Sequence, residues 1–414
     1  MKCRHCGQEL HHVFIDLFNS PPSNSYLNYE QLNEPETLYP LKIFVCDKCF
    51  LVQIDEYKKS DEIFDANYAY FSSYSTSWLE HSKRYVDMIV PRLGLNEQSY
   101  VIEIASNDGY LLQYVKEQNI PCLGIEPTAS TAKVSREKGI DTLEEFFGAE
   151  MAKSLQKADL ILGNNVLAHV PDINDFVKGL KNALKPQGTI TIEFPHLYNL
   201  LKYNQFDTIY HEHFSYLSLV AVQTIFAVQG LKIYDVEEIP THGGSLRIFA
   251  THTDNTIAIT ENVKNILAKE KEAKMNTLDG YLGFEQKVQQ IKWNFLDFLL
   301  QARKENKSIA AYGAAAKGNT FLNYCGVKSD AIKFVVDANP HKQNKFTPMS
   351  HIPIVSEEKI KEEKPDYVVI FPWNLAGEIA PHLRYIKSWG GDLLLAIPNL
   401  KIIKDFPPKR PDIY

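Results

Sequence analysis

The chain has 414 residues, 44% of them hydrophobic, and a formal net charge of −7 at neutral pH. This acidic balance excludes the broad basic surface typical of nucleic-acid binders, and no apolar run is long enough to cross a bilayer. The length exceeds what one ordinary hydrophobic core supports, so two or three domains are expected.

The first residues lack the apolar core of a secretory signal peptide, which favours a cytoplasmic protein. Two Cys-x-x-Cys pairs contain Cys3, Cys6, Cys46 and Cys49. In a reducing compartment such pairs favour a metal over disulfides, and four thiolates suit a tetrahedral zinc without an open position. The alternatives are a redox dithiol or unrelated buried cysteines, and His5 or His11 could replace one sulfur. We expect a structural zinc that stabilises a small segment poor in apolar runs.

An aromatic and hydroxyl-rich stretch follows at residues 68–75. Its main expected role is packing between domains. A second hypothesis is a lip over a neighbouring pocket, with Tyr70 or Tyr74 donating a hydrogen bond. A helix over Ser77–Arg92 is expected next, opened by a serine cap and ended near a proline and a glycine.

The stretch Val101–Gly109 is typical of a short buried strand that turns directly into a helix. Such a turn directs backbone N–H groups and the positive end of a helix to the sheet edge where nucleotide-like ligands bind. The next apolar run ends in Glu126, an acid placed to accept hydrogen bonds from ribose hydroxyls. The strands expected in this region are Tyr100–Ala105, Cys122–Glu126, a short one near Asp141, Leu160–Gly163, Thr189–Phe194, Lys232–Glu237 and Ser245–Ala250.

Seven strands that end in a hairpin-like pair resemble the class I methyltransferase fold, and the resemblance implies S-adenosylmethionine rather than NAD. Glu103 stands where that family has an acid, and two of the three usual loop glycines are Ala105 and Asn107. Alanine is small and asparagine tolerates left-handed backbone angles, so ligand approach stays possible. The alternative is a Rossmann-like core without a cofactor. The expected cofactor-binding residues are Glu103, Ala105, Ser106, Asn107, Gly109, Glu126, Asn164 and Asn165.

The most specific stretch is Tyr-His-Glu-His-Phe-Ser-Tyr-Leu-Ser, from Tyr210 to Ser218, between the fifth strand and a helix capped by Ser218. So many titratable side chains are costly to bury without a task, and one histidine suits a general base near neutral pH. A metal site is disfavoured because no third ligand lies nearby, and a structural hydrogen-bonded cluster is expected for His211 or Glu212. His169, after the fourth strand, can face the same cavity or be a core residue.

Arg247, beyond a glycine pair, can bind either a substrate phosphate or an internal acid. Residues Thr256–Ala302 indicate a charged helix pair, and a second α/β unit follows, with a loop over Gly313–Thr320 and a helix from Phe321. Its strands are expected at Ser308–Tyr312, Phe334–Val336, Tyr367–Phe371 and Asp392–Ile397. The loop has neither the dinucleotide fingerprint nor a Walker motif, so neither NAD nor ATP is indicated. A helix start that contains Lys317 suits an anion, although a solvated lysine is the alternative.

Five features together resemble the S-adenosylmethionine-dependent sugar C-methyltransferases of deoxysugar biosynthesis. They are the four cysteines, Glu-Ile-Ala-Ser-Asn-Asp-Gly, Tyr-His-Glu-His-x-x-Tyr, Thr-His-Gly-Gly-Ser-Leu-Arg and Gly-Ala-Ala-Ala-Lys-Gly. The resemblance implies methylation of a ring carbon, C-3, beside the ketone of a nucleotide-linked 4-keto-6-deoxy sugar. By that likeness His213 is the base and Tyr210 assists enolate formation. Further pocket residues would be His169, Glu212 and Tyr70, and the C-terminal domain would help to hold the nucleotide sugar. We expect Lys317 and Asn319 near its diphosphate, and Arg247 is a further candidate substrate-binding residue.

We therefore expect an α/β protein of three parts. These are a zinc-binding domain at 1–75, an S-adenosylmethionine-binding methyltransferase domain at 76–255, and a smaller Rossmann-like domain at 256–414 that helps to bind the nucleotide sugar. The alternatives are an O- or N-methyltransferase acting on a nucleotide sugar, or a non-catalytic nucleotide-sugar-binding protein. We expect a monomer or a weak homo-oligomer.

Overall fold

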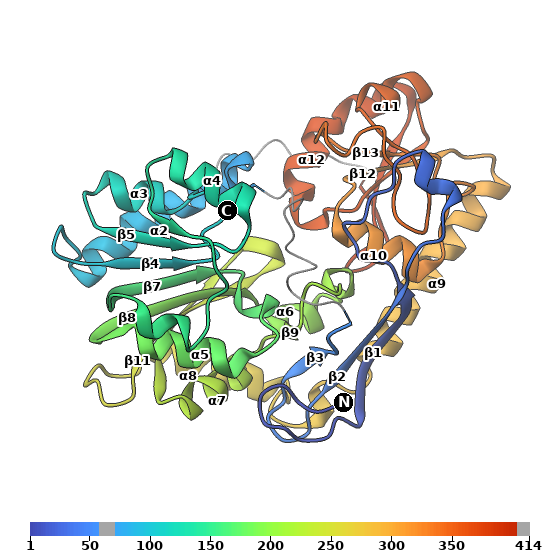
Figure 1. Cartoon of the computed structure of the whole chain (residues 1–414). Coiled ribbons are helices and arrows are strands. Elements are labelled where there is room, and N and C mark those ends of the chain that lie inside the picture. The colour runs from blue at the N-terminus through green and yellow to red at the C-terminus, as the bar shows by residue number, and fades with distance from the viewer. Residues whose placement is uncertain (58–70, 404–414) are drawn as a thin grey trace. The chain divides into compact units, whose positions relative to one another are not determined.

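The computed structural model describes residues 1–57 and 71–403. The chain forms two compact units, each assembled from segments that are distant in sequence (Figure 1). The first unit contains Met1–His11, Val45–His196 and Phe214–Gly280, and the second contains His12–Phe44, Leu197–His213 and Tyr281–Tyr414. These units describe compactness, so the expected division into three consecutive functional domains stays a prediction.

The first unit is built on a seven-stranded sheet with the order β10-β11-β8-β7-β4-β5-β6. The strands are β4 (Val101–Ile104), β5 (Cys122–Ile125), β6 (Thr142–Leu143), β7 (Ala158–Asn164), β8 (Leu184–Pro195), β10 (Leu231–Ile239) and β11 (Ser245–His252). All are parallel to their neighbours except β11, which is antiparallel to both β8 and β10. This order and the antiparallel pair at the end confirm the class I methyltransferase fold.

Helices cover both faces of this sheet, with α2, α3 and α4 along one side and α5, α7 and α8 along the other (Figure 1). They are α2 (Thr76–Leu93), α3 (Leu112–Glu117), α4 (Ala129–Glu137), α5 (Ile173–Ala183), α7 (Leu219–Val228) and α8 (Glu261–Glu272). Apolar residues of α2 and α3, among them Tyr85 and Val115, pack with β-strand residues in one core. The cap of α2 is Ser75, which accepts a hydrogen bond from the Trp78 amide, and the helix begins at Thr76, one residue before the expected start at Ser77.

Short elements complete the first unit. A small antiparallel pair joins β3 (Val52–Ile54) to β9 (Ser215–Tyr216). Ser218 caps α7, as predicted, by accepting a hydrogen bond from the Ala221 amide. The single-turn helices are η2 (Ser72–Tyr74), η3 (Met151–Ser154), η4 (Leu167–His169), η6 (Thr241–Gly243) and η7 (Leu278–Gly280).

The second unit contains a sheet with the order β14-β13-β12-β15-β16-β17, parallel except for β17. The strands are β12 (Ile309–Tyr312), β13 (Val335–Val336), β14 (Ile354–Val355), β15 (Tyr367–Ile370), β16 (Asp392–Leu395) and β17 (Lys401–Ile403). This is the predicted second Rossmann-like sheet, in which the order of the strands reverses next to β12.

The remaining elements of the second unit are β1 (His12–Ser20), η1 (Glu30–Asn33), β2 (Tyr39–Val45), α6 (Leu197–Lys202), η5 (Phe206–Thr208), α9 (Phe284–Lys304), α10 (Ala316–Cys325), α11 (Glu358–Glu363), η8 (Trp373–Leu375), α12 (Ala376–His382) and η9 (Leu383–Trp389). The region Thr256–Ala302, expected to be helical and charged, contains α8 in the first unit and α9 in the second. Helix α10 begins at Ala316, five residues before the expected start at Phe321. The helix includes Gly318, whose lack of a side chain makes room for the Phe371 ring.

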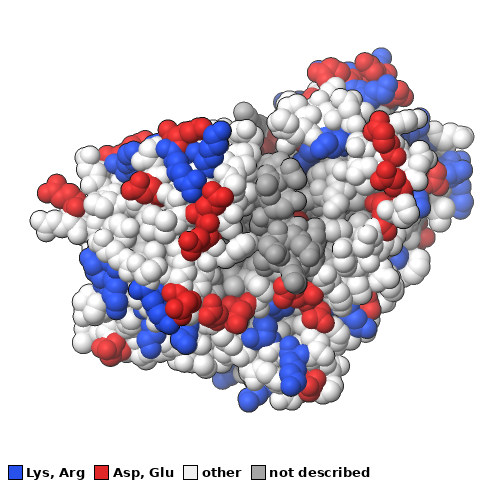
Figure 2. Space-filling view, viewed as in Figure 1, with Lys and Arg blue, Asp and Glu red and all other residues white. Residues whose placement is uncertain are grey.

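Within the described part of the chain, no helix combines the length and apolar composition that a bilayer crossing requires. Acidic and basic side chains are interspersed on the face shown in Figure 2. This agrees with the expected absence of a broad basic surface on that face.

Candidate active site and zinc site

The four N-terminal cysteines converge on one point. Their sulfur atoms all lie within 4.8 Å of one another, and the Sγ atoms of Cys3 and Cys49, and of Cys6 and Cys46, are 3.5 Å apart. Four sulfurs at this spacing fit the tetrahedral coordination of zinc. His5 is occupied elsewhere, because its Nδ1 lies 2.8 Å from Asn174 Oδ1. The donor set is therefore four thiolates, and the zinc it holds is structural.

The loop after β4 has the backbone angles typical of a glycine-rich loop, although only one of its three key positions is glycine. Ala105, Asn107 and Gly109 all have positive φ angles, of 55°, 50° and 72°. This conformation costs about 1–2 kcal/mol for a residue with a Cβ atom, and such strain concentrates at ligand-binding loops. The loop also lies tightly on β5, since a Cβ at Gly124 would be 2.4 Å from Ser106 Oγ. The substituted loop thus retains the expected ligand-binding shape.

Two acids flank this loop. Glu103 is fully buried, and burial raises the pKa of its carboxyl group well above the ordinary value. Glu126 accepts one hydrogen bond from the Asn107 amide and another from the Thr128 amide, each 2.9 Å long. Burial also raises the pKa of Glu126. Each Glu126 oxygen still has capacity for a second donor, such as a ribose hydroxyl.

Asn164 is the last residue of β7, the strand next to β4, and Asn165 follows it. Asn164 Nδ2 lies 3.4 Å from the Tyr110 hydroxyl. Asn165 has a φ of 56°, and its buried Oδ1 has no hydrogen-bond partner among the described residues. Strand order places these side chains at the switch point of the sheet, beside the β4 loop.

The aromatic stretch before α2 meets this loop through its backbone. The Ser72 amide donates to Asn107 Oδ1 at 2.9 Å, and the Ser73 amide to Asp108 Oδ2 at 3.3 Å. Tyr74 is 74% exposed, so no protein segment among the described residues covers it, and its hydrogen bond to a ligand stays a prediction. Tyr70 lies outside the described residues.

His213 belongs to the second unit and has its tautomer set by the backbone. Its Nδ1 lies 3.1 Å from the Thr208 carbonyl oxygen. A carbonyl oxygen can only accept, so Nδ1 carries the proton and Nε2 carries the basic lone pair. The Tyr210 ring lies 4.2 Å from the His213 ring, and the His213 amide donates to the Tyr210 carbonyl.

The two residues before His213 are held by the N-terminal segment of the same unit. His211 Nε2 lies 3.3 Å from the Tyr39 carbonyl oxygen, and burial lowers the pKa of His211. Glu212 accepts a hydrogen bond from Asn24 Nδ2 at 3.0 Å. Within the ranges described, the four cysteines are the only metal-type cluster of three or more ligands. His169 ends η4 in the first unit, where its amide donates to the Val166 carbonyl.

Lys317 lies in the first turn of α10, where its ammonium group donates to Asn374 Oδ1 at 2.8 Å and lies 4.5 Å from the centre of the Trp373 ring. Burial lowers its pKa. Asn319 is buried and donates from Nδ2 to the Ser23 carbonyl at 2.6 Å. Lys317 is therefore not the solvated lysine of the alternative hypothesis.

Sequence reasoning missed Asp207 and Thr208. Asp207 is buried, accepts a hydrogen bond from Trp373 Nε1 at 2.7 Å, and has its pKa raised to about 7 by burial. Thr208 acts through a backbone carbonyl, which gives no signal in residue type.

Arg247 is the predicted site residue whose surroundings argue against its role. Its guanidinium donates to Glu193 at 2.7 Å and to Glu237 at 2.8 Å. Glu193 also lies 2.9 Å from His81 Nε2, so the group is a buried internal network. Arg247 therefore matches the internal-acid alternative, and we do not propose it as a phosphate ligand.

Three family models match consecutive parts of the chain. The model described as "Putative zinc binding domain" matches residues 3–64, "Methyltransferase domain" matches 78–236, and "C-methyltransferase C-terminal domain" matches 240–398. The C-methyltransferase NovU of Streptomyces niveus is 32% identical over 406 residues, which are 97% of this chain and 96% of that protein.

Among solved structures, the PH0226 protein of Pyrococcus horikoshii OT3 is 13% identical, with 44% of this chain and 94% of that chain covered at a TM-score of 0.37. Magnesium protoporphyrin IX methyltransferase of Synechocystis PCC 6803, with bound S-adenosylmethionine, is 13% identical, with 42% and 81% covered at a TM-score of 0.33. The assignment stands on the family models and the full-length relative, which favour C-methylation over O- or N-methylation and over a non-catalytic role. The chain belongs to the S-adenosylmethionine-dependent C-methyltransferases with an N-terminal zinc-binding domain.

Proposed function

We propose that the protein methylates C-3, the carbon beside the ketone, of a nucleotide-linked 4-keto-6-deoxy sugar. The family supplies the reaction class, C-methylation. The observation that carries the acid–base step is the hydrogen bond from His213 Nδ1–H to the Thr208 carbonyl, because it leaves Nε2 as a base. S-adenosylmethionine supplies an electrophilic methyl group when it is bound.

In this mechanism His213 Nε2 removes the proton from the ring carbon, which is not nucleophilic until that proton leaves. The Tyr210 hydroxyl donates to the oxygen of the developing enolate. The new carbon–carbon bond forms as the bond from methyl to sulfur breaks, so the ketone is restored and the thioether leaves. His213 then releases its proton to water. Further pocket residues in the proposal are His169, Glu212 and Tyr70.

The proposal assigns the two ligands to different sets of residues. The methyl donor is held by Glu103, Ala105, Ser106, Asn107, Gly109, Glu126, Asn164 and Asn165. The sugar nucleotide has its diphosphate near Lys317 and Asn319. Both sets follow strands at the point where the order of a doubly wound sheet reverses, which is where such folds bind nucleotides. In domain terms, residues 1–75 bind zinc, 76–255 bind the donor and 256–414 help to bind the acceptor.

Proton exchange in deuterated water tests the proposal. The wild-type protein, incubated with a panel of 4-keto sugar nucleotides, should exchange the hydrogen beside the ketone and, with the donor present, place a methyl group on carbon by NMR. His213→Asn should lower both rates by about 10²- to 10⁴-fold, the usual contribution of general acid–base catalysis, with donor affinity unchanged by calorimetry. His341→Asn, an exposed histidine of the same unit, is the control.

Wild-type exchange rates in His213→Asn would remove His213 as the base. A wild-type protein that exchanges no hydrogen in any 4-keto sugar nucleotide would overturn the substrate class.

A further inference from the structure

Arg4 lies between the first two zinc cysteines, yet its side chain reaches away from the metal site. Nη1 donates to the Pro171 carbonyl at 2.6 Å, and Nη2 donates to the Ile54 carbonyl at 2.5 Å. The guanidinium carbon lies 5.3 Å from the centre of the Phe214 ring. One side chain thus joins the zinc knuckle to three other segments of the first unit.

Two of these segments adjoin residues of the proposed chemistry. Pro171 comes two residues after His169, at the end of η4, and Phe214 directly follows His213 in the chain. The third contact continues the second, since the Ile54 amide donates to the Phe214 carbonyl at 3.1 Å. Phe214 is 1% exposed, so the guanidinium packs over a ring fixed in the interior.

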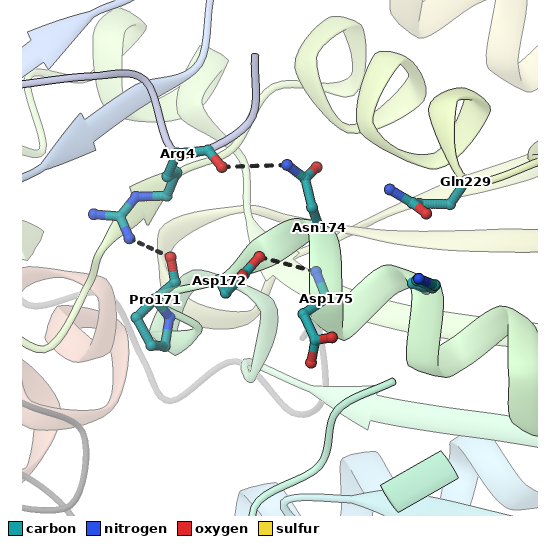
Figure 3. A pocket seen from close by; sticks show the side chains of 7 residues that line it. Arg4, Pro171, Asp172, Asn174, Asp175 and Gln229 are labelled. Carbon is teal, nitrogen blue, oxygen red and sulfur yellow. Dashed lines mark hydrogen bonds between the residues drawn. The ribbon is translucent and has the colours of Figure 1, made fainter. Parts of the chain in front are cut away.

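The backbone of Arg4 is held as firmly as its side chain. Its amide donates to Gln53 Oε1 at 2.8 Å, and Gln53 Nε2 lies 3.2 Å from Cys3 Sγ. From the other side, Asn174 Nδ2 in α5 donates to the Arg4 carbonyl at 3.3 Å (Figure 3) and to the His5 carbonyl at 2.8 Å. Hydrogen bonds to a metal-binding sulfur and to the backbone beside it orient that ligand. The contacts of Gln53 and Asn174 therefore fix Arg4 and the zinc-binding cysteine beside it in the same way.

Figure 3 shows Arg4 and Asn174 joined beside Pro171. These three residues help to line a pocket of about 560 Å³. Only a planar guanidinium can donate to two carbonyls in different directions while it covers an aromatic face. A lysine ammonium in the same place can reach one carbonyl but lacks the second, rigidly spaced N–H donor of a guanidinium.

We propose that Arg4 is a positioning residue for methyl transfer, through which the structural zinc orders the His169 loop and the chain that leaves His213. This inference rests on the proposed function and deepens it. Positional errors near 1 Å can lower rates about 100-fold, so loss of the guanidinium should affect turnover more than ligand binding. The zinc itself takes no part in the chemical step, because its four positions are filled by sulfur.

The test compares Arg4→Met with Arg84→Met, an exposed arginine of the same unit. Arg4→Met should retain one zinc per chain by elemental analysis and bind S-adenosylmethionine within about twofold of wild type. Its kcat should fall about 10- to 100-fold with the donor KM unchanged, and the exchange of the substrate hydrogen should fall in the same ratio. Amide hydrogen exchange should accelerate at the segments that Arg4 contacts, residues 52–54, 167–172 and 214–217, and not in the strands of the seven-stranded sheet.

Arg4→Lys is the second variant, for the case that Arg4→Met does not fold. It should fold, keep its zinc and show an intermediate kcat. Wild-type kcat in either variant would overturn the proposal, and so would a loss of activity that merely follows loss of zinc or of donor binding. Failure of the proposed function looks different, because wild-type protein would then show no exchange of the substrate hydrogen.

Discussion

The two units contain sheets with the same reversal of strand order, but the loops that follow their first strands differ. Ala105 directly follows β4 with a φ of 55°, and Gly313 directly follows β12 with a φ of 90°. A Cβ atom at Gly313 would lie 2.4 Å from the Pro372 ring, so the second loop has no room for the side chain that the first loop carries.

The polar atoms of the two loops differ as well. In the first unit Ser106 Oγ, Asp108 Oδ1 and Asn165 Oδ1 are buried without hydrogen-bond partners among the described residues. In the second unit Lys317 donates to Asn374 and Asn319 Nδ2 donates to the Ser23 carbonyl, while Asn319 Oδ1 is buried without a hydrogen-bond partner among the described residues. Both loops therefore leave buried oxygens unsatisfied, but only the second presents an ammonium group, that of Lys317, which the chain itself already engages. Fold alone does not set the ligand; the loop does.

The largest effect is expected for Gly313→Ala. The added methyl group meets the Pro372 ring and takes an unfavourable positive φ, so we expect a loss of about 3–5 kcal/mol in the stability of the second unit. Chemical denaturation followed by hydrogen exchange should show this loss in β12 and β15. A variant as stable as wild type would mean that the loop is not held by this contact.

Asp207→Asn tests the buried polar contacts of the second unit through the pH dependence of its stability. The folded-state pKa of Asp207 is about 7, above that of an unfolded aspartate. The folded protein thus holds this proton more tightly, and its stability falls as pH rises from about 4 to about 7 and then levels. Asparagine removes the titration, so relative to wild type the variant should gain about 4 kcal/mol across that range. Asp330→Asn, an exposed control, should keep the wild-type pH profile; parallel profiles for Asp207→Asn would contradict the assigned pKa.

Glu126→Gln should weaken S-adenosylmethionine binding about 100-fold. In the wild type the carboxylate accepts hydrogen bonds from two backbone amides, whereas glutamine has a single, uncharged oxygen that can accept only one of them well. Sugar-nucleotide binding should change by less than about twofold. Calorimetry with each ligand separates the two affinities, and Glu117→Gln is an exposed control. Equal losses for both ligands would show that the two loops are not independent.

Lys317→Ala tests the second loop in the same way as Glu126→Gln tests the first, with a smaller expected effect. Loss of the buried ammonium group should raise the KM for the sugar nucleotide about tenfold and leave donor affinity unchanged, since a charge-assisted contact contributes about 1.5–3 kcal/mol before compensation. The exposed Lys328→Ala provides the comparison. An unaltered KM would place the diphosphate elsewhere.

The smallest effect is expected for Ala105→Gly. Glycine relieves the left-handed strain but increases the entropy of the unfolded chain, so the net gain in stability should be about 0.5 kcal/mol. Thermal unfolding should show a rise of about 1–2 °C with donor affinity retained. A destabilised Ala105→Gly would mean that the alanine methyl group packs usefully in the loop.

Local patterns carried much of the structure. The strands of the first sheet and four strands of the second follow from short apolar runs, and the zinc ligands from Cys-x-x-Cys spacing, because these signals depend on neighbours in sequence. The short strands β14 and β17 were not predicted. Arg247 could not be resolved, because strand register places it opposite both Glu193 and Glu237. The His213–Thr208 contact was hidden for a different reason: a backbone carbonyl is present at every residue.

The alternation of the chain between its two units has a consequence for synthesis. Residues 12–44 leave the ribosome early but belong with Tyr281 and later residues, so they must wait for most of the remaining protein to be made. No single division of the chain yields either unit complete, and expression of one half of the chain would leave each unit without some of its segments. A gene fusion of two finished modules would not reproduce this interlaced order.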